Sequence, residues 1–458
     1  MNFSGKKVLV LGAGVTGLAA AHALKNRGAE IAFADDSVTA IEDFIISTPE
    51  NCDVNGWDFL LVSPGWKESH PLIQSALKAK IPLLNEIDLA WSFKDPWQKW
   101  IALTGTNGKT TTVEMAAAML RETGVKAVAC GNVGQTVIEC VDSREKYEVL
   151  VIELSSFQIH WLRDAKFSAS AILNIADDHV DWHKTFDDYA RVKVSILERS
   201  DIGILNADDF EVFNRTKEWS GNKIYYSLDT PASGEVGVVE ELMIDRAFVS
   251  NPQEASMIAE VVDVTPTVPH NVSNALAASA LALAAGANYE SIRKALQKFT
   301  LGRHRIEKVY ESDGITWVDD SKATNPHAAA ASIMSALSVI WIAGGLAKGA
   351  KMDQLIERVK GRLKVAILIG QDRDLIKSEL VKRAPHVEII EITAPSGFSK
   401  TSPNNEFMES IVRKARALAV SGDTVLLAPA CASMDQFESY ADRGDRFASA
   451  VKAVIENV

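Results

Sequence analysis

The chain has 458 residues, of which 47% are hydrophobic and 24% are charged, and its formal net charge is −12. This composition is ordinary for a globular protein and excludes a disordered, collagen-like or fibrous chain. Because an acidic surface repels phosphate backbones, we expect no nucleic-acid partner. The four cysteines are scattered without a C-x-x-C pair, which argues against a disulfide framework and favours a cytoplasmic location. At roughly 150 residues per domain, the length predicts about three domains.

The N-terminal region predicts a folded domain rather than a targeting segment. Its first apolar stretch, Val8–Ala21, follows two lysines and ends in small residues, as a signal peptide would. The stretch also contains Gly12, Gly14 and Gly17 in G-x-G-x-x-G spacing, and a second apolar run reaches Asp35. A strand, a turn, a helix and a second strand explain both runs. No apolar run has membrane-spanning length, so we expect no membrane insertion.

Strand patterns alternate with helical patterns along the chain, which predicts an α/β fold of parallel sheets covered by helices. The first block, residues 1–95, is typical of a Rossmann-like domain. Its expected elements are strands at Val8–Leu11, Ile31–Ala34 and Phe59–Val62 and a helix at Leu18–Arg27, followed by a linker at Phe93–Pro96.

The second block, residues 96–301, predicts a central domain of the P-loop ATPase type with a parallel sheet. We expect strands at Trp100–Leu103, Val149–Ile152, Ala169–Leu173 and Ile202–Leu205 and a helix at Val272–Gly286. Residues 228–270 lack a helical period and predict irregular or β structure. The third block, residues 302–458, predicts a second Rossmann-like domain with strands at Thr316–Val318, Ser338–Ala343, Val365–Ile369 and Thr424–Leu427.

The strongest chemical signal is a glycine loop between an expected strand and an expected helix, Gly105-Thr106-Asn107-Gly108-Lys109-Thr110-Thr111. Glycines let backbone N–H groups surround a phosphate, and the helix N-terminus adds partial positive charge. The lysine neutralises the β- and γ-phosphates, and a Thr hydroxyl reaches a metal ion. The motif is shorter than a full P-loop, because Leu103 stands where that pattern has its first glycine. The alternative is a chance glycine turn before a helix.

Two further residues follow expected strands of the same block. Glu153 comes directly after Val149–Ile152, and His179 lies in the segment after Ala169–Leu173. Ligands in open α/β sheets sit beyond the carboxyl ends of the strands, so both residues converge on the nucleotide if these strands flank the loop strand. Glu153 offers a hard oxygen ligand for Mg²⁺, and His179 indicates a second metal position. The alternative is a capping glutamate and a hydrogen-bonded loop histidine.

The third block carries polar residues after three of its expected strands. Two lysines and two hydroxyls make a plausible carboxylate-binding set, namely Lys322, Thr324, Lys348 and Ser433. The alternative is solvated lysines and helix N-caps.

Two weaker signals lie outside these clusters. The glycine turn at residues 12–17, with Asp35 and Asp36 after the next strand, fits a dinucleotide site, another nucleotide or tight helix–strand packing. The basic stretch Gly302–Arg305 fits either a phosphate contact between domains or a surface turn.

Taken together, these motifs resemble the Mur ligase family over essentially the whole chain and in the family's order. The segment Asp320–Asn325 and the segment Pro429–Phe437 are similar to the branch of the family that adds D-glutamate. The resemblance implies ATP-dependent addition of D-glutamate to UDP-N-acetylmuramoyl-L-alanine through an acyl phosphate, in peptidoglycan precursor synthesis. It also implies a cytoplasmic enzyme with three small-molecule substrates and two Mg²⁺ ions, which we expect to be a monomer.

The resemblance assigns roles residue by residue. For ATP it implies the loop residues Gly105, Thr106, Asn107, Gly108, Lys109, Thr110 and Thr111, together with Asn271, Arg305 and Asp320. For the metal ions it implies Thr110, Glu153, His179 and Lys193, and for catalysis Lys109, Glu153, His179 and Lys193. For the UDP substrate it implies Val15, Thr16, Asp35, Gly65 and Asn132. For D-glutamate it implies Lys322, Thr324, Lys348, Ser433 and Phe437.

The resemblance implies a role for Lys193 that the sequence pattern does not indicate. From the sequence pattern alone, Lys193 is a plain lysine on a helix surface. The resemblance implies that this lysine is carbamylated by CO₂, and a carbamate is a carboxylate that holds the second Mg²⁺ with His179.

Four other functions compete with this hypothesis. A sister Mur ligase or a folylpolyglutamate-type ligase would use another amino acid, and a P-loop ATPase or kinase would need no UDP-sugar. An NAD-binding oxidoreductase would use the first glycine turn, although no hydride site follows it. A non-catalytic nucleotide-binding protein would leave the three clusters at strand ends unexplained.

Overall fold

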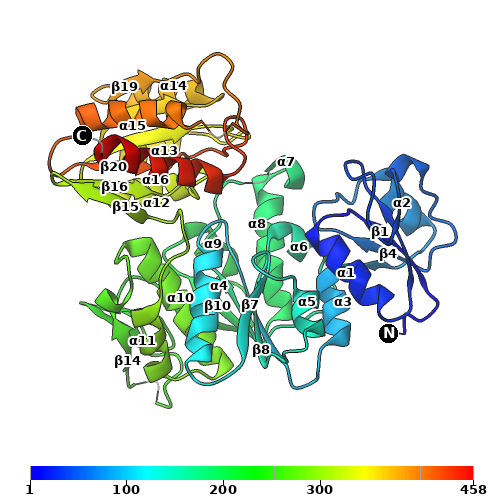
Figure 1. The fold of residues 1–458 in the computed structure, drawn as a ribbon. Helices are drawn as coiled ribbons and strands as arrows, with labels where there is room; N and C mark the ends of the chain where they lie inside the picture. The colour runs from blue at the N-terminus through cyan, green and yellow to red at the C-terminus, as the bar shows by residue number, and fades with distance from the viewer. Residues whose placement is uncertain (1, 179, 252, 403, 457–458) are drawn as a thin grey trace. The chain divides into compact units, whose positions relative to one another are not determined.

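The computed structural model describes residues 2–178, 180–251, 253–402 and 404–456. The chain forms two compact units, one of residues 1–267 with 271–299 and one of residues 268–270 with 300–458. The first unit contains a five-stranded and a nine-stranded sheet, and the second contains a six-stranded sheet (Figure 1). These three parallel-dominated sheets confirm the predicted three-part α/β fold. The domain boundaries at residues 95 and 301 remain a prediction.

The first sheet has the order β3-β2-β1-β4-β5, and every neighbouring pair is parallel. Its strands are β1 (Lys7–Leu11), β2 (Glu30–Ala34), β3 (Ile45–Ser47), β4 (Phe59–Val62) and β5 (Leu83–Leu84). Its helices are α1 (Val15–Lys25), the 3₁₀ turn η1 (Pro49–Asn51), α2 (Pro71–Lys78) and α3 (Glu86–Phe93). The strand order reverses direction between β1 and β4, and that reversal is where open α/β sheets bind ligands.

The second sheet has the order β14-β13-β12-β11-β10-β9-β6-β8-β7. Its parallel strands are β6 (Lys99–Thr104), β7 (Ala127–Gly131), β8 (Val149–Glu153), β9 (Ala169–Ile172), β10 (Ile202–Asn206) and β11 (Asn222–Tyr226). Three strands with antiparallel partners extend the edge, namely β12 (Val236–Val239), β13 (Leu242–Asp245) and β14 (Ser256–Glu260). The last three confirm the β structure expected within residues 228–270.

Helices cover both faces of the second sheet (Figure 1). They are α4 (Lys109–Arg121), α5 (Val137–Asp142), α6 (Ser156–Trp161), α7 (Val180–His183), α8 (Phe186–Val194), α9 (Phe210–Thr216), α10 (Pro269–Ala285) and α11 (Tyr289–Lys298), with 3₁₀ turns η2 (Ser195–Arg199) and η3 (Val261–Asp263). Helices α4, α10 and α11 bury their apolar faces against one side of the sheet in a single cluster that includes Leu103, Val113 and Leu276. This packing fixes the start of α4 directly beyond the end of β6.

One hydrophobic cluster joins the first and second sheets. It includes Phe33 and Leu61 of the first sheet and Trp100 and Ile152 of the second. Polar contacts reinforce the junction, because both terminal nitrogens of Arg27 donate to the carboxylate of Asp142 at 2.7 and 2.6 Å. The shared core explains why the two sheets form one compact unit.

The second unit has the sheet order β15-β16-β20-β17-β18-β19, in which β15 is antiparallel and the others are parallel. Its strands are β15 (Glu307–Ser312), β16 (Ile315–Asp319), β17 (Val339–Gly344), β18 (Leu363–Ile369), β19 (Glu388–Glu391) and β20 (Thr424–Leu427). Its helices are α12 (Pro326–Met334), α13 (Asp353–Val359), α14 (Arg373–Arg383), α15 (Glu406–Leu418) and α16 (Tyr440–Glu456). Two hydrophobic clusters, one on each face of the sheet, form its core.

The expected strands agree with the structure to within two residues at either end, and β4 and β20 have the predicted bounds. Helix α1 begins at Val15, three residues before the prediction, because Gly14 acts as its N-cap and the helix continues through Gly17 of the glycine turn. Among the described residues, no helix has both the length and the apolar character needed to cross a bilayer.

Glu86, at the first position of α3, is a buried acid between the first two sheets. Its Oε1 accepts a hydrogen bond from the backbone N–H of Ile138 in α5 at 2.5 Å. Burial raises the pKa of Glu86 to about 7, while backbone N–H groups of Ile138 and Val137 oppose the shift. The folded state therefore favours the protonated acid.

We predict that Glu86→Gln changes the pH dependence of stability. The folded-state pKa lies above its ordinary value of 4.5, so the free energy of unfolding of the wild type falls as pH rises from 4.5 towards 7. The glutamine keeps an acceptor for Ile138 without a charge, and the variant should gain up to about 3 kcal/mol relative to the wild type across that window. Urea unfolding at about pH 5 and about pH 8 measures this difference. Glu50→Gln, at an exposed position, is the control, and an equal difference at both pH values would contradict the prediction.

Candidate active site

The glycine loop after β6 is a tight backbone cradle. The Nζ of Lys109 turns back over the loop and donates to the carbonyl oxygens of Gly105 at 3.0 Å and Thr106 at 2.9 Å. Gly108 is the N-cap of α4 and has a φ of +81°. A Cβ at that position would lie 2.3 Å from Oδ1 of Asn274 in α10. The backbone conformation therefore favours glycine, and a methyl group there would also require the Asn274 side chain to move.

Strands β8 and β9 flank β6, as the strand-end argument required. The registers pair Leu103 with Glu153 on one side and Thr104 with Ile172 on the other. Glu153 consequently lies beside the glycine loop, with only 2% of its surface exposed. Its two carboxylate oxygens accept from neutral donors, Oε2 from the hydroxyl of Thr110 at 3.0 Å and Oε1 from the amide of Asn132 at 2.9 Å. A carboxylate, a hydroxyl and an amide make a hard-oxygen set of the kind that Mg²⁺ prefers.

The structure overturns the surface position that the sequence pattern indicated for Lys193. This lysine in α8 is 2% exposed, and its Nζ donates to the carbonyl of Gly105 at 2.8 Å and to Oγ1 of Thr104 at 3.2 Å. Burial lowers the pKa of Lys193 well below its usual value, and the nearby positive charge of Lys109 lowers it further. The helical period failed here because polar loop atoms, and not solvent, surround the amino group.

A second set of contacts fixes the loop to the segment after β9. The carboxamide of Asn174 bonds both backbone atoms of Asn107, accepting from its N–H at 2.8 Å and donating to its carbonyl at 3.1 Å. The hydroxyl of Thr106 lies 2.9 Å from the phenol oxygen of Tyr189 in α8. His179, the predicted metal ligand of this segment, lies outside the described residues.

The first glycine turn is held by Asp35 at the end of β2. Its carboxylate accepts from the backbone N–H groups of Ala13 at 2.7 Å, Ser37 at 2.8 Å and Val38 at 2.9 Å, and from the Ser37 hydroxyl at 2.8 Å. Burial alone would raise the pKa of Asp35, but these bonds outweigh it and lower the pKa to about 2. Asp35 therefore orders the turn as an anion.

The other residues predicted for the UDP substrate are accessible. Val15, the first residue of α1, is 71% exposed, which is unusual for a large apolar side chain. Thr16 is half-buried, and Gly65 and Asn132 are exposed. Gly65 follows β4, the strand beside β1, so it and the glycine turn belong to neighbouring strand ends.

Neighbouring loops of the second unit carry the five residues predicted for D-glutamate. The strands β16, β20 and β17 are adjacent, and cross-links tie the loops beyond their carboxyl ends. Leu346 and Ala432 exchange two backbone hydrogen bonds of 2.9 Å, and Ala430 donates to the carbonyl of Ala323 at 2.9 Å. The predicted residues on these loops are Lys322 and Thr324 after β16, Lys348 after β17, and Ser433 and Phe437 after β20.

These five residues differ in exposure. Lys348 is exposed, and Thr324 is half-buried. The Nζ of Lys322 lies 3.8 Å from the centre of the Tyr440 ring, a cation–π contact. Ser433 and Phe437 are buried. The loops at this edge therefore carry two lysines, a buried hydroxyl and a buried aromatic ring.

Arg443 in α16 is a residue of this edge that the sequence did not reveal. Its guanidinium is fully buried and donates to the hydroxyl of Ser321 at 2.9 Å, to the carbonyl of Ser321 at 3.0 Å and to the carbonyl of Cys431 at 3.2 Å. Burial lowers the pKa of Arg443 to about 10. Arg443 thus ties two of the loops together, and a lone arginine in an amphipathic helix gives no signal of such a role.

The remaining predicted ATP residues belong to both units. Asn271, in the first turn of α10, is buried and donates to the carbonyl of Pro266 at 3.0 Å. Arg305 and Asp320 belong to the second unit. Burial raises the pKa of Asp320 to about 7, and Arg305 is among the groups that oppose the shift.

His304, Glu307 and Asp319 form one further group of potential metal ligands. Their ligand atoms lie within 4.8 Å of one another. Nδ1 of His304 is 2.7 Å from Oδ2 of Asp319, and the backbone N–H of His304 donates to Oε2 of Glu307 at 2.9 Å. The His304–Asp319 side-chain contact and the backbone hydrogen bond to Glu307 account for this group without an ion.

Comparisons with known proteins agree with this geometry. The family model described as "Mur ligase middle domain" matches residues 103–282, and the model described as "Mur ligase, glutamate ligase domain" matches residues 304–431. The UDP-N-acetylmuramoylalanine–D-glutamate ligase of Thermobifida fusca is 42% identical, covering 99% of this chain and 100% of the relative. The ligase of the same name from Streptomyces avermitilis is 40% identical, covering 99% of each chain.

Solved structures share the fold at low sequence identity. A pseudomurein peptide ligase type C from Methanothermus fervidus has a TM-score of 0.58 at 18% identity, covering 98% of this chain and 100% of the other. A UDP-N-acetylmuramate–alanine ligase from Thermotoga maritima has a TM-score of 0.56 at 16% identity, covering 98% and 99%. At these identities the likeness shows the fold alone.

We predict that Gly108→Ala weakens nucleotide binding strongly. The new methyl would meet Asn274, and a positive φ costs an alanine about 1–2 kcal/mol, so the loop should lose its shape. Titration with ATP should show binding weakened at least about tenfold. Gly124→Ala is the matched control, because Gly124 lies just beyond the other end of α4 with a φ of +90° and open space around it. It should lose similar stability and still bind ATP, whereas wild-type binding by Gly108→Ala would refute the prediction.

Proposed function

This chain belongs to the Mur ligase family, and we propose that it joins D-glutamate to UDP-N-acetylmuramoyl-L-alanine at the expense of ATP in peptidoglycan precursor synthesis. Relatives with that activity in their name match nearly the whole chain, which supports the choice of amino acid. The observation that carries the proposal is the convergence of Lys109, Glu153 and Lys193 on one glycine loop. Such a set suits phosphoryl transfer from ATP to a carboxylate.

The reaction needs activation of the substrate carboxylate, because its oxygen is a poor leaving group. Transfer of the γ-phosphoryl group from ATP to that oxygen releases ADP and forms an acyl phosphate. The amine of D-glutamate then attacks the acyl carbon, the carbon–oxygen bond to phosphate breaks, and the amine loses a proton. Backbone N–H groups of the loop hold the phosphates, and Lys109 exchanges its loop carbonyls for phosphate oxygens.

The hard-oxygen donors beside the loop fit Mg²⁺. Thr110 and Glu153 would hold one ion, and His179 with carbamylated Lys193 would hold a second. When bound, the ions supply charge neutralisation for the transferring phosphoryl group. Asn132 keeps the Glu153 carboxylate oriented, since it donates to the oxygen that Thr110 does not use.

Burial of Lys193 supports the proposed carbamate. An amine must be neutral to attack CO₂, and the low pKa of Lys193 favours that form. The product, R–NH–COO⁻ with release of one proton, would place an anion near Lys109. Formation of the carbamate would therefore add an attraction to Lys109 at a position where a protonated Lys193 would be repelled.

The other substrates are assigned to the remaining clusters. Lys322 and Lys348 carry the charges that pair with the two carboxylates of D-glutamate, and Thr324, Ser433 and Phe437 complete that set. Asn271, Arg305 and Asp320 are proposed for ATP. The UDP end would lie on the first glycine turn, where Asp35 acts by ordering the turn and contacts come from Val15, Thr16 and Gly65. Asn132 would contact the same substrate beside Glu153. We propose domains 1–95, 96–301 and 302–458 for these three roles, in a cytoplasmic monomer.

An omission assay tests the proposed function. Phosphate release should require ATP, UDP-N-acetylmuramoyl-L-alanine and D-glutamate together, and leaving out any one should reduce it to background. Activity with L-lysine or L-alanine in place of D-glutamate would point to a sister ligase. ATP hydrolysis without the UDP-sugar would point to an ATPase, and either result would overturn the proposal.

We predict that Lys193→Arg lowers kcat roughly 100-fold or more, because a guanidinium keeps the positive charge and cannot form a carbamate. Short carboxylic acids added to Lys193→Ala should restore part of the activity by supplying the missing carboxylate. Lys166→Arg, at an exposed position, is the control for the substitution itself. Full activity of Lys193→Arg would remove the carbamate from the mechanism.

A further inference from the structure

The loop after β4 packs against the first glycine turn. The hydroxyl of Ser63 donates to the carbonyl of Gly12 at 3.3 Å. The indole nitrogen of Trp66 would lie 2.9 Å from a methyl group placed on Gly12, so the ring sits directly on the turn. Any shift of residues 63–66 must therefore move the glycine turn as well.

Two tryptophans of the central region hold this loop by its backbone. Nε1 of Trp182 in α7 donates to the carbonyl of Gly65 at 3.0 Å. Nε1 of Trp161, the last residue of α6, donates to the carbonyl of Trp66 at 3.3 Å. Two successive carbonyls of the first region thus receive indole N–H groups from two separate elements of the second.

The ring of Trp182 is fixed to the segment that begins with Glu153. It packs against Phe157 and His160 of α6, each with ring centres 5.0 Å apart, and against His183 at 4.5 Å. His183 in turn lies 2.9 Å from the hydroxyl of Ser156, three residues beyond Glu153. The hydrogen bond to Gly65 is therefore anchored at the carboxyl end of β8.

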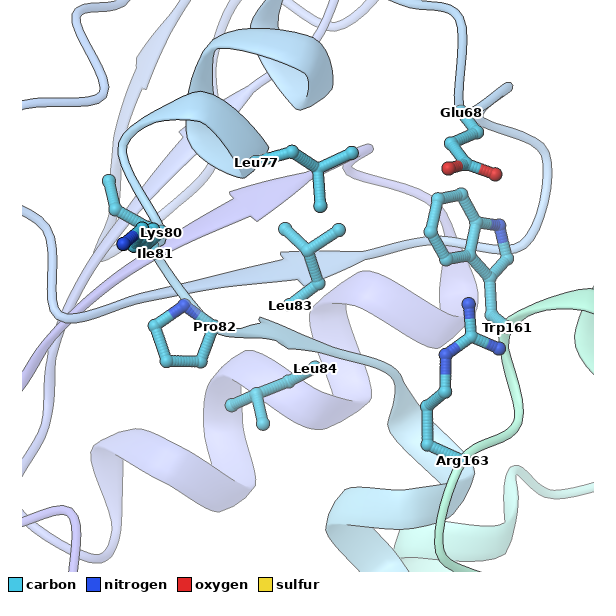
Figure 2. A pocket seen from close by; sticks show the side chains of 9 residues that line it. All are labelled: Glu68, Leu77, Lys80, Ile81, Pro82, Leu83, Leu84, Trp161 and Arg163. Atoms are coloured by element: carbon cyan, nitrogen blue, oxygen red, sulfur yellow. The ribbon is translucent and has the colours of Figure 1, made fainter.

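Trp161 is anchored through its backbone, and its ring borders a pocket. The carbonyl of Trp161 accepts from the carboxamide of Asn85 at 2.8 Å, at the start of α3. Figure 2 shows its ring beside Glu68 and Arg163 at one side of a pocket of about 320 Å³, whose opposite side is formed by Leu77, Lys80 and Pro82. Trp161 is only 4% exposed and belongs to a hydrophobic cluster with Leu60 and Leu72, so packing and the indole hydrogen bond together set the ring's orientation.

From this geometry we propose that Trp161 and Trp182 are positioning residues that set the separation between the glycine turn and the glycine loop of β6. The inference rests on the proposed function, in which the UDP end of one substrate lies on the turn and its carboxylate must reach the γ-phosphate. Misplacement by about 1 Å can cost on the order of 100-fold in rate. The two indoles keep the UDP end of the substrate at the distance that lets its carboxylate reach the γ-phosphate, and they do not touch the reacting atoms.

The test compares Trp182→Phe and Trp161→Phe with Trp57→Phe in steady-state kinetics. Phenylalanine keeps an aromatic ring and removes the indole donor. Trp57 is the matched control, because its Nε1 also donates to a backbone carbonyl, that of Asp53 at 3.0 Å, away from the loop. For the first two variants we expect kcat/KM for UDP-N-acetylmuramoyl-L-alanine to fall about tenfold, while KM for ATP and the affinity for free UDP stay within about twofold.

A purely structural role would lower stability and affect both substrates equally, so equal changes for ATP and the UDP-sugar would overturn the inference. Wild-type kinetics in Trp182→Phe would also overturn it. Trp182 is partly exposed, so its variant decides the matter even if Trp161→Phe fails to fold. Absence of ligase activity in the wild type would instead overturn the proposed function, and the two failures are thereby distinguished.

Discussion

The adjacency of β8, β6 and β9 is the constraint on which the candidate site depends. Because parallel strands end at the same edge of a sheet, the register that pairs Leu103 with Glu153 fixes a carboxylate beside the glycine loop. On the other side, β9 delivers Asn174, whose carboxamide closes on Asn107. Once β6 has paired with β8 and β9, these residues lie at the same edge of the sheet without any further rearrangement of the chain. The backbone hydrogen bonds of the sheet therefore determine where the chemical groups lie.

That arrangement explains how the protein tolerates buried charge. Glu153 and Lys193 are each almost fully buried, and an isolated ion in such a place would be strongly disfavoured. Thr110 and Asn132 satisfy the carboxylate, and the loop carbonyl of Gly105 satisfies the amine. The dipoles are in place before any substrate arrives, and preorganised dipoles of this kind stabilise a developing charge more effectively than water does.

The sequence predicted the strands well because buried parallel strands are short apolar runs between turn residues. It also predicted that Lys109 and Glu153 lie together beyond neighbouring strand ends, and the register of β6 and β8 places them there, while their chemical roles stay a prediction. It could not predict the environment of Lys193 or Arg443, because helical periodicity indicates an apolar face and says nothing about a polar loop that meets it. The roles of Trp161 and Trp182 were hidden for a related reason: their partners are backbone carbonyls, which every residue has. Resemblance to a family supplied the hypothesis of a carbamate on Lys193, which no residue pattern indicates.

The continuous hydrophobic cluster between the first two sheets has a consequence for cooperativity. Phe33 and Leu61 contribute to the same core as Trp100 and Ile152, so neither sheet can lose its packing without exposing apolar surface of the other. Thermal unfolding of one sheet would therefore unfold the other in the same cooperative transition. The three blocks of the sequence therefore correspond to two units of unfolding, one with the first two sheets and one with the third.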